Sequence, residues 1–402
     1  MTIRLPSFPH IKKSYLAGGL LLWSILTAGF SSGAVLGQVD KIVIVVLLFR
    51  AVVMFRPKVQ PRSLLLIVST ALYGLFWMLD CTFSVCGSSV EGTGTNVLRF
   101  VIYYLAFAVL RNNNAVRIAP QVVLFSLIFF VLGLFAQGDF SVLQSLGALG
   151  QDQFWNSYRF GIENETNNIN YTAMVLATLV PFAFPRQPAD LIGILALVCI
   201  AALVIATYSR SGLALYGVLL ILSGISIWGL SVGRTIFLVA LCIGAFMTIK
   251  SLGYFSFRSF DLINDASGAA RLAVFDVLYK LQPFGQKQIL SDYSQIGAID
   301  NALIRHLVGS GSLSILILVP GIALAWQATR HLVQNLPENR AAIAALGWLM
   351  TVILDDQVFS LWGAFVLAWF GSRPTTNTTY LSALQTKEVV GKTVPAQASR
   401  SC

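Results

Sequence analysis

The sequence predicts an all-α, polytopic membrane protein with about a dozen transmembrane helices. Its 402 residues are 56% hydrophobic and only 11% charged, whereas soluble domains carry about 25% charged residues. Apolar runs close to the ~20 residues that cross a ~30 Å hydrocarbon core recur from one end of the chain to the other. These runs are rich in Leu, Ile, Val, Ala and Gly and lack period-2 alternation, which favours helices over a β-barrel.

The apolar runs define the boundaries of the expected spans. Segment 39–55 is the least typical of them, because it is short and carries Arg50, whose side chain can reach back toward the membrane surface. The ninth and tenth spans are separated by a large loop of residues 253–302. The predicted spans are 15–36, 39–55, 63–80, 97–110, 119–137, 170–185, 190–207, 212–229, 235–252, 303–327, 341–354 and 357–371.

The net charge of +10 does not indicate a nucleic-acid partner, because the basic residues follow the predicted topology. Most of the 27 Lys and Arg residues lie at one side of the spans, where only Asp190, Glu338 and Glu388 carry acidic groups. The positive-inside rule assigns this side to the cytoplasm. We therefore expect an inner-membrane protein with both termini in the cytoplasm and a disordered cytoplasmic tail of residues 373–402. The cytoplasmic segments are 1–14, 56–62, 111–118, 186–189, 230–234, 328–340 and 372–402.

The opposite, periplasmic side carries the longer loops. They are residues 138–169, the short turn 207–212 with the sequence TYSRSG, and the large loop 253–302. Within the large loop, the stretch RLAVFDVLYKL, which begins at Arg271, repeats apolar residues at helical spacing and predicts an amphipathic helix at the membrane interface. No nucleotide-binding glycine motif occurs in a suitable context, so ATP is not an expected energy source.

Cys81 and Cys86 both fall in a predicted outside loop, residues 80–96. Their spacing and their compartment are compatible with a disulfide, and two unpaired thiols are an equal alternative. Nothing in the sequence indicates a metal site, and we expect no cofactor.

Two arginines are the strongest candidates for binding an anion. Arg210 interrupts two apolar spans, where a charge is costly, and small residues flank it. The alternative for Arg210 is an interfacial anchor that reaches lipid phosphates. Arg271 lies near the amino end of the amphipathic helix, where anions are favoured. Since the arginine fork matches phosphate oxygens, two such residues on one side suit a diphosphate.

The remaining candidates rest on weaker signals. Arg159 and Arg305 are further basic residues of the periplasmic side, although either one alone is more often structural. The carboxylates of Asp300, Glu163 and Glu165 could serve as general bases, although carboxylates in loops are usually only solvated.

Three segments resemble the O-antigen ligase and polymerase superfamily. TYSRSGLAL resembles its Ser-Arg turn, GAARLAVFDVLYKLQPFG its main periplasmic loop, and ENETNNINYTAMVLATLVPF the Asn-rich segment before a helix. The resemblance covers about residues 160–325. It implies a glycosyltransferase whose single domain, residues 1–372, acts without a metal on glycans carried by undecaprenyl diphosphate at the periplasmic face. Arg210 and Arg271 would bind the diphosphate, with Arg159, Lys280, Asn301 and Arg305 as further substrate-binding candidates.

The resemblance departs from the ligase branch at one motif. Ligases carry His-Asn, nine residues and Gly-x-x-Gly, whereas this chain has Asp300-Asn301, nine residues and Gly311-Ser-Leu-Ser314. The ligase histidine is therefore replaced by Asp300, and His306 lies too far along the chain to occupy that position. This favours a Wzy-type polymerase of lipopolysaccharide, capsule or exopolysaccharide repeat units, with Asp300 as the catalytic base. A ligase that transfers glycan to lipid A-core is the alternative.

A lipid-linked oligosaccharide flippase is the competing class, since such proteins also have about a dozen helices and a cationic cavity. The absence of two similar halves and the long loop argue against it. The expected partners are the undecaprenyl-diphosphate-linked oligosaccharide, the lipid bilayer, a chain-length regulator and a separate flippase.

Overall fold

The structure is a computed structural model and is α-helical wherever it is described. No strand occurs in the described residues, so the predicted all-α class is confirmed for them. The described residues are 13–28, 45–46, 49, 61–83, 88–112, 116–148, 169–187, 190–229, 232–251, 282–285, 302–333, 339–351 and 359–372.

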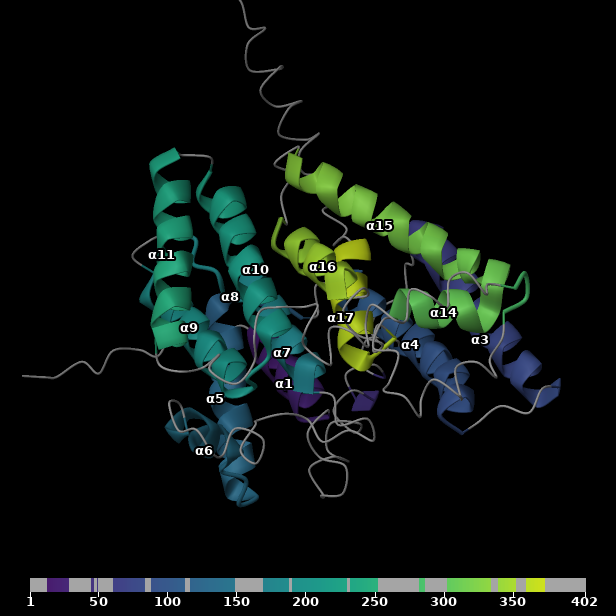
Figure 1. Cartoon of the computed structure of the whole chain (residues 1–402), viewed down its shortest axis with the longest axis horizontal. Helices are drawn as coiled ribbons and strands as arrows, with labels where there is room; N and C mark the ends of the chain where they lie inside the picture. Colours follow the sequence, from purple (N-terminus) through teal and green to yellow (C-terminus); the bar gives the residue numbers. More distant parts are fainter. Residues whose placement is uncertain are drawn as a thin grey trace, which may run out of the picture.

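Every predicted span except 39–55, most of which lies outside the described residues, falls on a helix (Figure 1). The first half of the chain contains α1 (Lys13–Ala28), α3 (Pro61–Phe83), α4 (Ser88–Asn112), α5 (Pro120–Ala136), α6 (Ser141–Gly147), α7 (Ile169–Thr178), α8 (Val180–Ala183) and α9 (Leu191–Ala206). The second half contains α10 (Arg210–Trp228), α11 (Val232–Ser251), α14 (Ala302–Ser310), the 3₁₀ turn η2 (Gly311–Ser314), α15 (Ile315–Val333), α16 (Asn339–Thr351) and α17 (Leu361–Gly371).

Several of these helices are suited to a membrane. In the described part of the chain, four helical stretches are long and apolar enough to cross it: Leu64–Phe83, Gly92–Asn112, Arg210–Trp228 and Leu303–Val333. The last of these runs through α14, η2 and α15. A fifth is possible if α5 and α6, which are bent by 99° relative to each other, form one broken span. Shorter apolar helices accompany them. A membrane protein is thus supported, while the number of about a dozen crossings stays a prediction.

The observed helix boundaries differ from the predicted ones in three places. Residues 138–169 are not a loop throughout, because α6 lies within them, and α4 begins nine residues before the predicted span 97–110. The predicted span 170–185 is interrupted between α7 and α8. Pro181 lies at the start of α8, and because proline has no backbone N–H it removes one helical hydrogen bond there.

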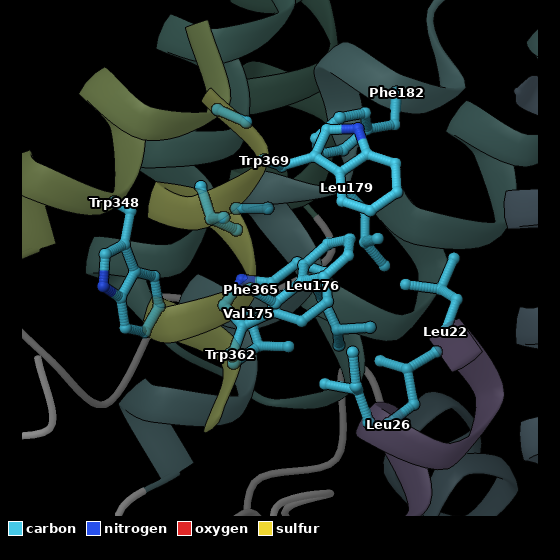
Figure 2. Close-up of a cluster of buried hydrophobic side chains, with 14 of the residues drawn as sticks. Leu22, Leu26, Val175, Leu176, Leu179, Phe182, Trp348, Trp362, Phe365 and Trp369 are labelled. Atoms are coloured by element: carbon cyan, nitrogen blue, oxygen red, sulfur yellow. The ribbon is translucent and has the colours of Figure 1, made fainter. Parts of the chain in front are cut away.

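The helix α17 forms the centre of the described bundle. All residues from Trp362 to Trp369 are buried, as expected for a helix that is apolar on every face. Phe365 lies edge-on to Phe107 of α4 with ring centroids 5.5 Å apart. Trp362 donates its indole N–H to Thr178 Oγ1 at 2.7 Å, so its polar atom is satisfied inside the core. Figure 2 shows this cluster, with side chains from α1, α7, α16 and α17 around Phe365.

Segments that were predicted for the cytoplasmic side contact one another. The Arg117 N–H donates to the Ser14 carbonyl at 3.0 Å, and the Arg111 guanidinium lies 4.8 Å from the centre of the Trp369 ring. Arg340, at the start of α16, donates to the carbonyls of Phe182 and Phe184. The three contacts join helix ends that are far apart in sequence.

Segments that were predicted for the periplasmic side also contact one another. The Tyr208 hydroxyl donates to the Ser145 carbonyl at 2.8 Å, which joins the 207–212 turn to loop 138–169. Arg305 donates to Thr93 Oγ1 at 3.1 Å, which joins the start of α14 to loop 80–96. The Arg117–Ser14 and Tyr208–Ser145 contacts each join two segments predicted for the same side, and the sidedness itself stays a prediction.

Candidate functional site

Two of the predicted site residues lie within the described part of the chain, and they belong to different clusters. Arg210 is the first residue of α10, and Arg305 lies in the second turn of α14. The other five predicted residues lie outside the described residues. They are Arg159, Arg271, Lys280, Asp300 and Asn301.

The first cluster, which we call the serine-arginine turn, consists of Asn170, Tyr208, Ser209 and Arg210. Ser209 has an extended backbone, and its hydroxyl oxygen accepts a hydrogen bond from the Gly212 N–H at 3.2 Å, which caps the amino end of α10. The same hydroxyl donates to Asn170 Oδ1 at 2.8 Å. Two of the segments that carry the family resemblance, the Asn-rich segment and the Ser-Arg turn, are thereby joined.

The turn presents positive charge to its surroundings. Arg210 is partly exposed and lies in the first turn of α10, where the free backbone N–H groups give a helix a partial positive charge. The neighbouring Ser211 hydroxyl lies 3.1 Å from Ser209 Oγ, so two hydroxyls accompany the guanidinium. Ser209 and Gly212 are buried, so Arg210 and Ser211 are the partly exposed residues of this turn.

Tyr208 holds the turn in a strained conformation. Its φ of 53° is in the left-handed region, which no other described residue except glycine adopts. Its hydroxyl donates to the carbonyl of Ser145 in α6, and burial raises the pKa of the Tyr208 phenol above its ordinary value. Such backbone strain is concentrated at functional sites. The resemblance predicted the Ser-Arg turn but not the contribution of α6 to it.

The second cluster, which we call the α14 histidine cluster, consists of Tyr73, Trp77, His306, Ser310 and Phe359. The Tyr73 hydroxyl oxygen lies 2.7 Å from His306 Nδ1 and 2.8 Å from Ser310 Oγ. His306 is buried, with the rings of Tyr73, Trp77 and Phe359 edge-on at centroid distances of 5.5, 5.6 and 5.1 Å. The sequence does not indicate this role of His306, since its partner Tyr73 is 233 residues away and no local pattern predicts the contact.

The end of α14 meets a short turn within the predicted large periplasmic loop, residues 253–302. Residues 282–285, with the sequence QPFG, form a tight turn in which the Gly285 N–H donates to the Gln282 carbonyl at 3.0 Å. The Ser312 N–H and hydroxyl both donate to the Pro283 carbonyl, at 2.8 and 2.7 Å. The QPFG turn therefore packs on the helix break that follows α14.

Two glycines allow this approach. Gly285 and Gly311 have φ values of 80° and 55°, which side-chain-bearing residues rarely adopt. A Cβ atom at Gly285 would overlap the Gly309 carbonyl, and one at Gly311 would overlap the carbonyls of Gln282 and Pro283. Ser314, where the ligase pattern has its second glycine, is buried and donates its hydroxyl to the Gly311 carbonyl at 2.7 Å.

Cys81, at the end of α3, is disulfide-bonded, which decides for a bridge at this cysteine. Its partner lies outside the described residues. Cys199 and Cys242 are free and half-buried within the apolar helices α9 and α11.

No family model and no curated protein sequence matches the chain, so its function rests on the residues described above.

Proposed function

We propose that the protein is a glycosyltransferase that polymerises undecaprenyl-diphosphate-linked oligosaccharide repeat units at the periplasmic face of the bacterial inner membrane. The observation that carries the proposal is the serine-arginine turn. There Ser209 caps α10, binds Asn170 of the Asn-rich segment and leaves Arg210 in the first helical turn. This arrangement concentrates a guanidinium, hydroxyls and helix-end N–H groups, all of which favour a phosphate-bearing ligand.

The proposed topology has about a dozen spans, with both termini in the cytoplasm and the large loop in the periplasm. The sorting of contacts at the two ends of the bundle supports it. Arg117 contacts Ser14 at one end, and Tyr208 contacts Ser145 at the other. With this orientation Arg210 faces the compartment into which flipped lipid-linked oligosaccharides are delivered.

The proposed reaction is a single displacement at the anomeric carbon of the donor. A hydroxyl oxygen of the acceptor repeat unit forms the new glycosidic bond, while the bond from the anomeric carbon to the diphosphate oxygen breaks with inversion. Asp300 takes the proton from the acceptor hydroxyl, and the electron pair leaves with undecaprenyl diphosphate. Arg210 and Arg271 stabilise the charge that develops on the leaving group.

The polymerase is favoured over the ligase because Asp300 occupies the place of the ligase histidine. His306 is a poor substitute for that histidine, since it is buried and its ring lies among those of Tyr73, Trp77 and Phe359. A ligase that uses Asp300 as base is the second candidate, and a flippase is the third.

The test is polymer synthesis in proteoliposomes that contain the purified protein and lipid-linked repeat units. We expect a ladder of lipid-linked polymer. Arg210→Ala should lower its rate roughly 100-fold, which corresponds to ~3 kcal/mol for a charge-assisted phosphate contact. Arg210→Lys should retain part of the rate, because an ammonium keeps the charge but loses the bidentate fork.

The matched control is Arg330→Ala. Arg330 is exposed in the last turn of α15, at the end of the bundle that is predicted to face the cytoplasm. This variant should leave the ladder unchanged. A normal ladder from Arg210→Ala would refute the diphosphate assignment. Transfer only to lipid A-core would favour the ligase, and transport without new glycosidic bonds would favour the flippase.

A further inference from the structure

At the end of the bundle away from the serine-arginine turn, a partly buried arginine holds two helices together. Arg340 of α16 donates from its two terminal nitrogens to the carbonyls of Phe182 and Phe184, at 3.1 and 2.7 Å. These carbonyls lie at the carboxyl end of α8, where a helix carries partial negative charge. Arg340 is thus a structural cap for the interrupted α7–α8 helix.

Two more arginines lie close to this cap. Arg186, two residues beyond Phe184, is exposed and repels Arg340. Arg234 of α11 is also exposed and donates to the Trp228 carbonyl at 2.7 Å. Trp228 in turn donates its indole N–H to the Pro185 carbonyl at 3.2 Å, and its ring lies 4.8 Å from that of Phe184. These contacts connect all three guanidinium-bearing segments.

The positive charge of the three arginines exceeds the negative charge of the described residues around them, where Asp190 is the carboxylate that acts on Arg340. Among the described residues, no carboxylate forms an ion pair with Arg186, Arg234 or Arg340. Burial and the charge of Arg186 lower the pKa of Arg340 to about 10, while Asp190 opposes this shift, so Arg340 stays charged at neutral pH. The carboxylate of Asp190 already accepts the Gly193 N–H as the cap of α9.

Exposed apolar side chains flank the cluster on two helices. On α9, Leu191 is 68% exposed and Ile192 is 45% exposed directly after the Asp190 cap. On α11, which packs beside α10 (Figure 1), Val232 and Ile236 are 78% and 62% exposed on either side of Arg234. Charged groups and apolar faces therefore meet at one level of the bundle.

We propose that Arg186, Arg234 and Arg340 form a binding site for the headgroup of an anionic phospholipid, whose acyl chains lie against α9 and α11. A phosphodiester supplies the negative charge that the cluster lacks, and the flanking apolar faces favour a lipid over a free phosphate ion. Basic sites between membrane helices on the cytoplasmic side commonly bind such lipids. The site is separate from the proposed glycan chemistry and does not depend on it.

The test is lipid binding by the purified full-length chain in nanodiscs. The thermal midpoint should rise as phosphatidylglycerol replaces phosphatidylcholine, and native mass spectrometry should detect retained phosphatidylglycerol. The double variant Arg186→Ala, Arg234→Ala keeps the structural Arg340. It should bind phosphatidylglycerol roughly 30-fold more weakly, since each basic residue near an anionic surface contributes about a factor of five.

Three results would overturn the proposal. One is an equal midpoint in phosphatidylglycerol and phosphatidylcholine. Another is an equal stabilisation by inorganic phosphate in phosphatidylcholine nanodiscs, which would indicate a site for a soluble anion. The third is an equal loss of binding in Arg330→Ala, because Arg330 is an exposed basic residue outside this cluster and would report only a general attraction to the charged surface.

Discussion

At the scale of single residues, the hydroxyl of Ser209 links three parts of the candidate site. A serine hydroxyl has one donor and two acceptor positions. Here it accepts the Gly212 N–H and donates to Asn170 Oδ1. The start of α10, the position of Arg210 and the attachment of α7 therefore depend on one side chain.

We expect Ser209→Ala to destabilise the protein and Ser223→Ala to leave its stability nearly unchanged. The first substitution removes a helix cap, which costs about 1–2 kcal/mol, and also removes a hydrogen bond to Asn170. Ser223 is equally buried on the same helix, but its hydroxyl has no hydrogen-bond partner in the described structure. Thermal unfolding in detergent measures both variants, and equal losses would contradict the assigned role of Ser209.

The pair of Tyr73 and His306 makes a different residue-scale prediction. When one member of a buried hydrogen-bonded pair is removed, the other polar group is left unsatisfied. Each single substitution therefore lowers the free energy of unfolding by more than the hydrogen bond itself contributes. The double-mutant cycle uses Tyr73→Phe and His306→Ala. The loss of unfolding free energy in the double variant should be about 1 kcal/mol smaller than the sum of the losses in the two single variants.

Tyr103→Phe is the control for that cycle. Tyr103 is a partly buried tyrosine of α4 that lies outside the α14 histidine cluster. Its loss should add to that of His306→Ala without coupling. Coupling of the same size for Tyr103 would show that the cycle reports a general loosening of the bundle.

At the scale of helices, three amino ends share a capping pattern. Asp190, Ser209 and Ser360 each accept a hydrogen bond from the N–H of a glycine three residues later. The predicted starts of these helices, which follow from the apolar runs alone, lie within a few residues of those observed, and the capping residue before each run marks the start more closely. The break at Leu179 and the short α6 depend on tertiary packing as well, so hydropathy alone does not indicate them.

The glycine of the second cap also sets the distance between two helices. A Cβ atom at Gly212 would overlap the Ala173 Cβ atom of α7, whereas Gly217 of the same helix has no atom of another residue within reach. Gly212→Ala should therefore lower the free energy of unfolding by about 1–3 kcal/mol through overpacking. Gly217→Ala should raise it by about 0.5–1 kcal/mol, since alanine is the better helix former.

Thermal or denaturant unfolding of the two variants measures this difference in sign. Because the two sites lie on one helix and differ mainly in their neighbours, the pair separates packing from helix propensity. Destabilisation of similar size by both alanines would mean that α7 does not approach α10 as closely as the structure has it.

At the scale of the whole molecule, the sequence yields a prediction of sidedness but few predictions of which residues are neighbours. Sidedness depends on where Lys and Arg lie along the chain, which can be read without tertiary structure. The contact between Tyr73 and His306 joins residues 233 apart, and the contact between the QPFG turn and Ser312 depends on backbone conformation at two glycines. The resemblance to a family indicated Arg210, but the described structure was needed to add α6 and Asn170 to its surroundings.

The proposed sidedness can be tested with two exposed glutamines. Gln137 follows α5 at the end predicted to be periplasmic, and Gln187 lies beside Arg186 at the end predicted to be cytoplasmic. In a background with all five cysteines of the chain replaced by alanine, Gln137→Cys should react with a membrane-impermeant maleimide added to spheroplasts of a bacterial host. Gln187→Cys should react only after the membrane is permeabilised, because a charged maleimide does not cross the hydrocarbon core. Labelling of both cysteines from outside would place the proposed lipid site and the serine-arginine turn on the same side, which is incompatible with a bundle whose basic end faces the cytoplasm.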